Sequence, residues 1–365
     1  MSEEPNYSSF DRALHRLAFG SPAIQETAAD IEGLLFGKRY RDVVVERPIF
    51  VTSLPRAGTT LVLEILARVP GIATHTYRDM PFVLAPVLWD ALSRSFRRPS
   101  DLKERAHGDG MAVGYDSPEA FEEILWRRFW PHKYGSDSIA LWTAEENQPG
   151  FADAFCDHIR KIIALRAGGV PGGRYASKNN ANIARIGLLR KLFPDGIILV
   201  PVRDPVDQAV SLLQQHRRFG ELHARDAFAR QYMHDIGHYE FGELHKPLAF
   251  AGLDRIRAQY RPDTLDYWVA YWECAFQHVL AARASVVFVS YETLCASGPG
   301  LMRALAEPLA IPAEALVTAL GDRVWAPRQR QPGATVNDAD LEHRVRALYQ
   351  ELLESSLTAQ SGWTR

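Results

Sequence analysis

The sequence predicts an α/β fold in which helices cover both faces of a mainly parallel central sheet, giving three layers. Strand-like and helix-like segments alternate from residue 151 to about residue 311. The run "GIILVPVRDP", residues 196–205, begins with uninterrupted apolar residues, which is typical of a strand buried on both faces of a parallel sheet. The strand-like "IFV" at 49–51 leads through a short turn into a helical pattern. Such alternation indicates parallel βαβ units.

The individual elements follow from hydrophobic periodicity and from helix-ending residues. Residues 1–46 are expected to form one or two helices, because leucine and isoleucine recur there at helical spacing. A strand at 49–53 precedes a helix at 59–69, which ends at Pro70-Gly71. Further along, the sequence predicts helices at 151–168, 181–193, 206–219, 267–283 and 300–311, and strands at 174–178, 196–205 and 285–294.

We expect one α/β domain over residues 47–325, preceded by the helical segment 1–46 and followed by a basic loop and helix at 326–365. Within the domain, residues 72–150 are irregular and rich in tryptophan. Two interpretations of this insertion stay open: a pocket wall on the acceptor side, or a helical subdomain with an aromatic core. The tryptophans concerned are Trp89, Trp126, Trp130 and Trp142.

The composition is that of an ordinary soluble globular protein, with 47% hydrophobic and 24% charged residues in 365. A net charge of −2 gives no reason to expect nucleic acid as a partner. The three cysteines, Cys156, Cys274 and Cys295, fit neither a disulfide framework nor a zinc site. The N-terminal "MSEEPNYSSF" is too acidic for a signal peptide, and no apolar run reaches the roughly 18 residues of a membrane span. We therefore expect a cytoplasmic protein.

The segment "LPRAGTT", residues 54–60, has the features of an anion-binding turn. A helix N-terminus presents unpaired N–H groups and the positive end of the helix dipole. Gly58 lets the backbone approach a ligand oxygen, and Thr59 and Thr60 can cap the helix or donate to a phosphate. Arg56 adds a planar cation with several donors. The alternative is an ordinary helix N-terminus that binds no ligand and has an arginine beside it by chance.

This turn differs from the loop that nucleoside triphosphatases use to hold phosphates. Ser53 stands where that loop has its first glycine, and Thr59 stands where it has lysine. Without the lysine, cleavage of a γ-phosphate is not expected.

A second candidate anion site follows the buried strand. Arg203-Asp204-Pro205 comes directly after it, and Ser211 lies eight positions beyond Arg203, in the next predicted helix. An arginine and a serine placed in this way can hold a second phosphate. The alternatives are a salt bridge for Arg203 and an ordinary mid-helix hydroxyl for Ser211.

With these motifs the chain resembles the sulfotransferases that use 3′-phosphoadenosine 5′-phosphosulfate (PAPS). "LPRAGTT" resembles their 5′-phosphosulfate loop, with arginine in place of lysine, and "RDPVDQAVSLL" resembles their 3′-phosphate motif. "VFVSYETL" resembles the later strand of the family, so the likeness spans about Ile49 to Ile311. It implies a fold related to the P-loop kinases, and metal-free transfer of a sulfuryl group to a hydroxyl of a small-molecule, carbohydrate or lipid acceptor.

The resemblance also implies a role for each matching residue. Arg56, the backbone of Ala57 to Thr60 and the two threonine hydroxyls would bind the 5′-phosphosulfate, while Arg203 and Ser211 would bind the 3′-phosphate. Taken together, the candidates for nucleotide contact are Arg56, Ala57, Gly58, Thr59, Thr60, Arg203, Ser211, Tyr291, Arg328 and Arg330. The alternative for Tyr291 is a core aromatic at the end of a strand. The alternative for Arg328 and Arg330 is that they lie on a solvated charged loop. Leu61 stands where many soluble members have an adenine-stacking tryptophan.

The general base is not given by the resemblance. Lys178 matches a lysine expected near the transferred sulfuryl group, but the family's histidine two positions later is Asn180 here, and an amide is no base at neutral pH. Other branches use a glutamate downstream of the loop arginine, and the nearest groups in that region are Asp79 and His75. We favour Asp79, with His75 second; a pair between Asp79 and Arg78 and a packing role for His75 are the alternatives.

Two other functions stay open from the sequence. Asn180 is compatible with a non-catalytic nucleotide-binding module that has lost its base. A magnesium-dependent nucleotide or small-molecule kinase would use the same kind of loop.

Overall fold

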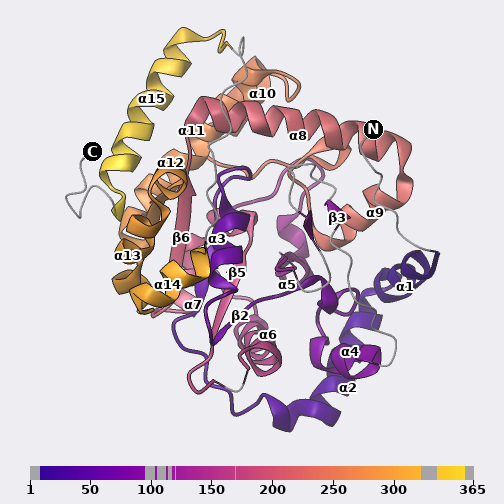
Figure 1. Ribbon diagram of the computed structural model, residues 1–365. Helices are drawn as coiled ribbons and strands as arrows, with labels where there is room; N and C mark the ends of the chain where they lie inside the picture. The colour runs from indigo at the N-terminus through magenta and orange to yellow at the C-terminus, as the bar shows by residue number, and fades with distance from the viewer. Residues whose placement is uncertain are drawn as a thin grey trace.

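The computed structural model describes residues 9–94, 103–104, 112–113, 117–119, 121–168, 170–321 and 335–357. Short strands and many helices alternate along the chain (Figure 1). The strands are β1 (Ile49–Val51), β2 (Ile72–Ala73), β3 (Lys103–Glu104), β4 (Ala112–Val113), β5 (Arg174–Lys178), β6 (Ile197–Val202) and β7 (Val287–Ser290). The helices are α1 (Ser9–Phe19), α2 (Pro22–Phe36), α3 (Thr59–Leu66), α4 (Pro86–Ser93), α5 (Glu123–Phe129), α6 (Phe151–Arg166), α7 (Ile186–Leu192), α8 (Pro205–Arg225), α9 (Ala227–Ile236), α10 (Leu253–Gln259), α11 (Leu265–Ala281), α12 (Tyr291–Ala296), α13 (Gly298–Leu309), α14 (Ala313–Leu320) and α15 (Ala339–Glu354).

Among the described residues, the central sheet has five strands in the order β2-β5-β1-β6-β7, and every pair in it is parallel. In the middle of the sheet, Ile49 lies opposite Ala176 on one side and Ile197 on the other. The predicted α/β fold with a parallel sheet is therefore confirmed. A separate antiparallel pair joins β3 and β4.

The two faces of the sheet pack against different sets of helices. On β1, Phe50 belongs to one buried cluster while Ile49 and Val51 belong to the other, because successive side chains of a strand point to opposite faces. The Phe50 cluster includes residues of α6, α7, α8 and α11, and the Ile49 cluster includes residues of α3, α13 and α14. The three predicted layers are thus present, as Figure 1 shows.

One expected strand is shorter than predicted. The run 285–294 forms strand only to Ser290, and "YETL" begins helix α12. The reason is a cap: the Ser290 hydroxyl oxygen accepts a hydrogen bond from Thr293 N at 3.1 Å, which satisfies a first-turn N–H group.

The tryptophan-rich insertion contributes core residues. Trp126, Trp130 and Trp142 are buried, and the Arg185 guanidinium lies 4.2 Å from the Trp126 ring centroid and 4.1 Å from that of Trp142. Arg185 also pairs with Glu123 at 2.7 Å. These rings therefore enclose a buried ion pair, which favours the interpretation as an aromatic core.

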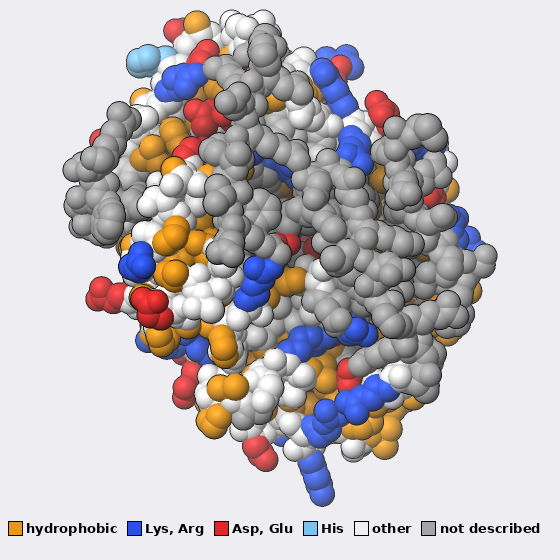
Figure 2. Space-filling view, viewed as in Figure 1, with side chains coloured by type: hydrophobic (Ala, Val, Ile, Leu, Met, Phe, Trp, Pro, Cys, Tyr) orange, Lys and Arg blue, Asp and Glu red, His pale blue; other side chains and the backbone are white. Residues whose placement is uncertain are grey.

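The surface view in Figure 2 shows lysine, arginine and acidic side chains distributed over the same face, in keeping with the small net charge. No helix in the described part of the chain combines the length and apolar character needed to cross a membrane.

Candidate functional site

The predicted site residues gather at one edge of the sheet. Arg56 follows β1, Lys178 ends β5, Arg203 follows β6 and Tyr291 follows β7. Because the strands are parallel, their carboxyl ends lie at the same edge, where α/β proteins commonly bind ligands.

The two candidate anion-binding turns are in direct contact. Arg56 Nε donates to Ser211 Oγ at 2.9 Å, and Arg203 Nη1 donates to the Arg56 carbonyl oxygen at 3.0 Å. The Arg203 guanidinium also lies 4.8 Å from the ring centroid of Tyr291. Two cations and a hydroxyl thus converge from loops that are far apart in sequence.

The turn after β1 has an unusual backbone. Arg56 and Gly58 have φ angles of 72° and 90°, both in the left-handed region. A Cβ atom at Gly58 would lie 2.7 Å from Tyr291 Cδ2, so this position requires glycine for space as well as for backbone conformation. For Arg56 the same conformation costs roughly 1–2 kcal/mol, a strain that often occurs at ligand-binding loops. Gly58 is the N-cap of α3, so no cap side chain competes for the first N–H groups of that helix.

Capping fixes the position of Arg203. The Asp204 carboxylate accepts hydrogen bonds from Val206 N at 3.0 Å and Asp207 N at 2.9 Å, which starts helix α8 immediately after the arginine. Asp204 N in turn donates to Glu292 Oε1 at 2.9 Å, which ties the end of β6 to the start of α12.

Helix α8 is also joined to the turn after β1. Gln208 Nε2 donates to the carbonyl oxygens of Leu54 and Pro55 at 3.1 and 2.9 Å. Trp272 Nε1 donates to Gln208 Oε1 at 3.0 Å, so the amide is held on both sides. Gln208 thereby joins α8 to the turn after β1, a role that could not be predicted from local sequence.

A cavity of about 530 Å³, part of it open to solvent, lies beside the turn; we call it the loop cavity. Its lining combines residues that the sequence predicted with residues that it did not. The predicted members are Arg56, Thr59, Thr60 and Lys178, and the others are Pro55, Asn180, Phe219, His223, Met233, His238, Glu240 and Phe241.

Asn180 connects the turn to a carboxylate. Thr59 Oγ1 donates to Asn180 Oδ1 at 3.4 Å, and Asn180 Nδ2 donates to Glu240 Oε1 at 3.2 Å. The amide therefore places Glu240 next to the position at which the resemblance led us to expect a histidine base.

The comparisons with known proteins agree with this geometry. A family model described as "Sulfotransferase family" matches residues 48–249, more than half of the chain. The chain belongs to the sulfotransferase family. A search of curated proteins gave no match.

Among the solved structures similar to this sulfotransferase, STF9 supports the fold, and two others are weaker matches. STF9 from Mycobacterium avium is 17% identical with a TM-score of 0.51, over 96% of this chain and 87% of that one. STF1 from Mycobacterium tuberculosis is 15% identical with a TM-score of 0.46, over 86% and 79% of the two chains. A sulfotransferase from Alicyclobacillus acidocaldarius is 16% identical with a TM-score of 0.38, over 88% and 100%.

Neither of the favoured base candidates, Asp79 and His75, lines the loop cavity. Asp79 and His75 are 2% and 1% exposed, and His75 Nδ1 lies 2.8 Å from Asp79 Oδ2 while its Nε2 lies 2.7 Å from His158 Nε2. Arg166 completes the cluster through an ion pair with Asp79. Burial alone would raise the pKa of Asp79, but Arg166 and His75 outweigh it and hold that pKa below its usual value. The structure does not support either residue as the base, because a base must reach the acceptor.

Glu240, His238 and His223 line the loop cavity but were not among the predicted site residues. Glu240 and His238 lie between α9 and the 3₁₀ segment η6 (Gly242–Leu244), where the flanking Gly237 and Gly242 both have positive φ. The string "GHYEFG" carried a loop signal in its glycines, but nothing local linked it to Asn180.

His223 stands out in the loop cavity. It is buried, and neither ring nitrogen has a hydrogen-bond partner among the described residues. Burial lowers its pKa, so the ring is neutral near pH 7 and carries one donor and one acceptor for a ligand.

Other sequence predictions have plain outcomes. Arg328 and Arg330 lie outside the described residues. Leu61, on α3, is buried in the cluster on that side of the sheet and does not line the loop cavity.

Proposed function

We propose that this sulfotransferase transfers the sulfuryl group of PAPS to a hydroxyl of a small-molecule, carbohydrate or lipid acceptor. The observation that carries the proposal is the contact between the two anion-binding turns, in which Arg56 meets Ser211 and Arg203. A nucleotide with phosphates on both its 5′ and 3′ oxygens needs two such turns at one edge.

The residues present fit this nucleotide. Arg56 and Arg203 supply permanent positive charge, and the first turn of α3 supplies N–H groups and the positive end of a helix dipole. Thr59 and Thr60 add hydroxyls in the loop cavity. The unpartnered ring nitrogens of His223 in the same cavity support the presence of a polar ligand there.

In the proposed reaction the bound nucleotide supplies the sulfuryl group, and the chain stabilises the charge that develops. Arg56 and the first N–H groups of α3 donate to the oxygen that becomes the leaving phosphate, which lowers the barrier because these donors are already oriented. Lys178, which lines the loop cavity at the end of β5, contacts the transferred group. Arg203 and Ser211 hold the 3′-phosphate.

Tyr291 supports this arrangement from below. Its ring lies against Gly58 and under the Arg203 guanidinium, so we assign it the task of orienting Arg203 as well as contacting the nucleotide. Burial raises the pKa of Tyr291, so its hydroxyl keeps its proton near neutral pH.

A cytoplasmic location stays a prediction. It is supported by the three cysteines, Cys156, Cys274 and Cys295, which form no disulfide.

Incubation of the protein with sulfur-labelled PAPS and a panel of hydroxyl acceptors tests the proposal. We expect labelled product in the presence of a chelator, with no increase on adding Mg²⁺. Turnover of ATP with Mg²⁺ would instead indicate a kinase. Tight binding of adenosine 3′,5′-bisphosphate without turnover on any acceptor would indicate a non-catalytic module.

A further inference from the structure

The loop cavity adjoins a second cavity of about 680 Å³, part of it open to solvent, which we call the apolar cavity. The two cavities share a set of lining residues, so they meet at one place. The shared residues, which we call the junction, are Pro55, Lys178, Asn180, His238, Glu240 and Phe241. A ligand in the loop cavity and a ligand in the apolar cavity would therefore come closest to each other at the junction.

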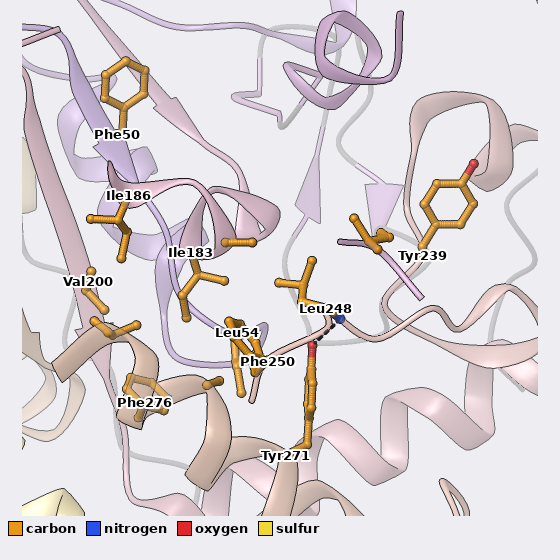
Figure 3. Packing of buried hydrophobic residues seen from close by; sticks show 14 of the residues in the cluster. Phe50, Leu54, Ile183, Ile186, Val200, Tyr239, Leu248, Phe250, Tyr271 and Phe276 are labelled. Carbon is orange, nitrogen blue, oxygen red and sulfur yellow. Dashed lines mark hydrogen bonds between the residues drawn. The ribbon is translucent and has the colours of Figure 1, made fainter. Parts of the chain in front are cut away.

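Beyond the junction the apolar cavity is lined mainly by buried hydrophobic side chains. Figure 3 shows Leu54 and Tyr271 near Leu248, with the Tyr271 hydroxyl directed at the Leu248 backbone, and Tyr239 on another loop segment. Trp268 completes the wall. Pockets for small molecules commonly have this character, with a few polar groups at one end.

The polar atoms deep in the apolar cavity already have partners. Tyr271 Oη accepts from Leu248 N at 2.9 Å, and Trp268 Nε1 donates to the Pro262 carbonyl at 2.8 Å. Lys246 Nζ donates to the Gly135 carbonyl at 2.8 Å.

The carboxylate and amide at the cavity edge are paired as well. Asn179 Nδ2 donates to Glu123 Oε2 at 2.7 Å, and Glu123 is paired with Arg185. A ligand with hydroxyls all around it would bury several of them without partners, at about 1–3 kcal/mol each. A ligand with an apolar body avoids that cost.

A hydrogen bond to the Glu240 backbone fixes this residue at the junction. The Glu240 carbonyl oxygen accepts from His245 Nδ1 at 2.7 Å, which fixes the tautomer, and His245 Nε2 then accepts from the Tyr267 hydroxyl at 2.9 Å. Burial lowers the pKa of His245 to about 3, so this neutral pairing persists over the physiological range. The Glu240 side chain meets Asn180 at 3.2 Å.

We propose that the apolar cavity binds the acceptor, an uncharged alcohol or phenol with an apolar body, and that Glu240 accepts the proton of its hydroxyl at the junction. The inference rests on the proposed function. The acceptor O–H bond breaks and its proton goes to the Glu240 carboxylate, while a new bond forms between that oxygen and the sulfur. The bond from sulfur to the nucleotide's phosphate oxygen breaks, and the bisphosphate leaves with the electron pair.

The first experiment compares Glu240→Gln with Glu243→Gln, using 2-naphthol and labelled PAPS. Glu243 is exposed in the same segment and pairs with Arg230, so it is a matched control. We expect Glu240→Gln to lower kcat by about 10²–10⁴-fold, with bisphosphate affinity and acceptor affinity unchanged. Full activity in Glu240→Gln, or its loss only in His238→Gln, would overturn the assignment.

The second experiment measures acceptor binding without turnover, by calorimetry with 2-naphthol on the bisphosphate-saturated protein. Ala181 lines the apolar cavity, so Ala181→Leu should weaken 2-naphthol at least tenfold and leave bisphosphate affinity unchanged. Ala304→Leu, at a half-buried alanine of α13, should change neither. Unaltered 2-naphthol binding in Ala181→Leu would contradict the inference.

The third experiment compares acceptors directly. We expect 2-naphthol and 1-octanol to accept the label and methyl glucoside to accept far less. Equal or better use of methyl glucoside would overturn the acceptor class. If bisphosphate binds but neither apolar alcohol is used, this inference fails while the donor site stands; if bisphosphate does not bind at all, the proposed function fails with it.

Discussion

Arg56 Nε lies 2.9 Å from Ser211 Oγ, a contact between residues 155 positions apart. It joins the turn after β1 to the second turn of α8, and it orients the guanidinium before a ligand arrives. A bound nucleotide can then use both groups without reordering a long side chain, which favours affinity because less conformational entropy is lost.

Ser211→Ala removes one hydroxyl from this site. We expect adenosine 3′,5′-bisphosphate to bind roughly 5- to 10-fold more weakly, which corresponds to about one hydrogen bond. Titration calorimetry measures the change. Ser355→Ala, at a half-buried serine after α15, serves as the control and should bind as the wild type does. Equal affinity in Ser211→Ala would remove this serine from the site.

Gly58→Ala introduces both backbone strain and a clash with Tyr291. We expect stability to fall by roughly 1–2 kcal/mol and bisphosphate affinity to fall at least tenfold, since the added methyl displaces the ring that supports Arg203. Gly168→Ala is the matched control, because Gly168 also has positive φ but has no atom within 4 Å of an added Cβ. It should lose stability without losing affinity; similar losses of affinity in both variants would contradict the account.

Asp79→Asn tests whether Asp79 stabilises the fold within its buried cluster with His75 and Arg166 or acts as the base. Because the residue is structural, we expect about 2–4 kcal/mol of lost stability but normal kcat in the protein that remains folded. The pKa of Asp79 is depressed in the folded state, so its stabilisation is present above pH 3.8 and is lost as the pH falls further. Denaturant unfolding from pH 2 to pH 7 should therefore show the two proteins converging in acid. A loss of kcat without a loss of stability would restore Asp79 as a base candidate.

Glu122→Gln tests a second buried carboxyl, which accepts from Ser177 and Asn182. Burial raises the pKa of Glu122 from 4.5 to about 7, so the folded state keeps a proton that the unfolded chain releases. Stability contributed by this group is present below pH 4.5 and is lost as the pH rises to about 7. Relative to wild type, Glu122→Gln should gain on the order of 3 kcal/mol across that window.

Urea unfolding at pH 4.5 to 8 measures this shift. Glu314→Gln, at an exposed glutamate of α14, should follow the wild-type curve throughout. Parallel stability curves for Glu122→Gln and wild type would show that Glu122 does not titrate as described.

The elements around the proposed donor site could largely be predicted from the sequence, because their determinants are local. The strand at 174–178 appears with the same bounds, and Arg203 directly follows a buried strand as expected. Strand, turn and helix are contiguous there, so spacing along the chain reports position in space. The same holds for Gly58, whose positive φ is a property of the turn itself.

The proposed acceptor side could not be predicted, because its residues are distant from one another in sequence. Asp79 and His75 had a suitable place in the chain, but chain position does not report depth, and both are buried. Glu240 reaches Asn180 across 60 positions through the packing of the loop after α9. Only the folded arrangement shows that contact.

The central claim is that Arg203 binds a 3′-phosphate while Arg56 binds the 5′ end. Calorimetry of adenosine 3′,5′-bisphosphate and of adenosine 5′-monophosphate, with wild type and with Arg203→Met, tests it in one thermodynamic cycle without Mg²⁺. We predict that wild type prefers the bisphosphate and that Arg203→Met reduces this preference at least tenfold, leaving only the part that Ser211 contributes. A preference that is unchanged in Arg203→Met, or a wild type that binds neither nucleotide, would contradict the account.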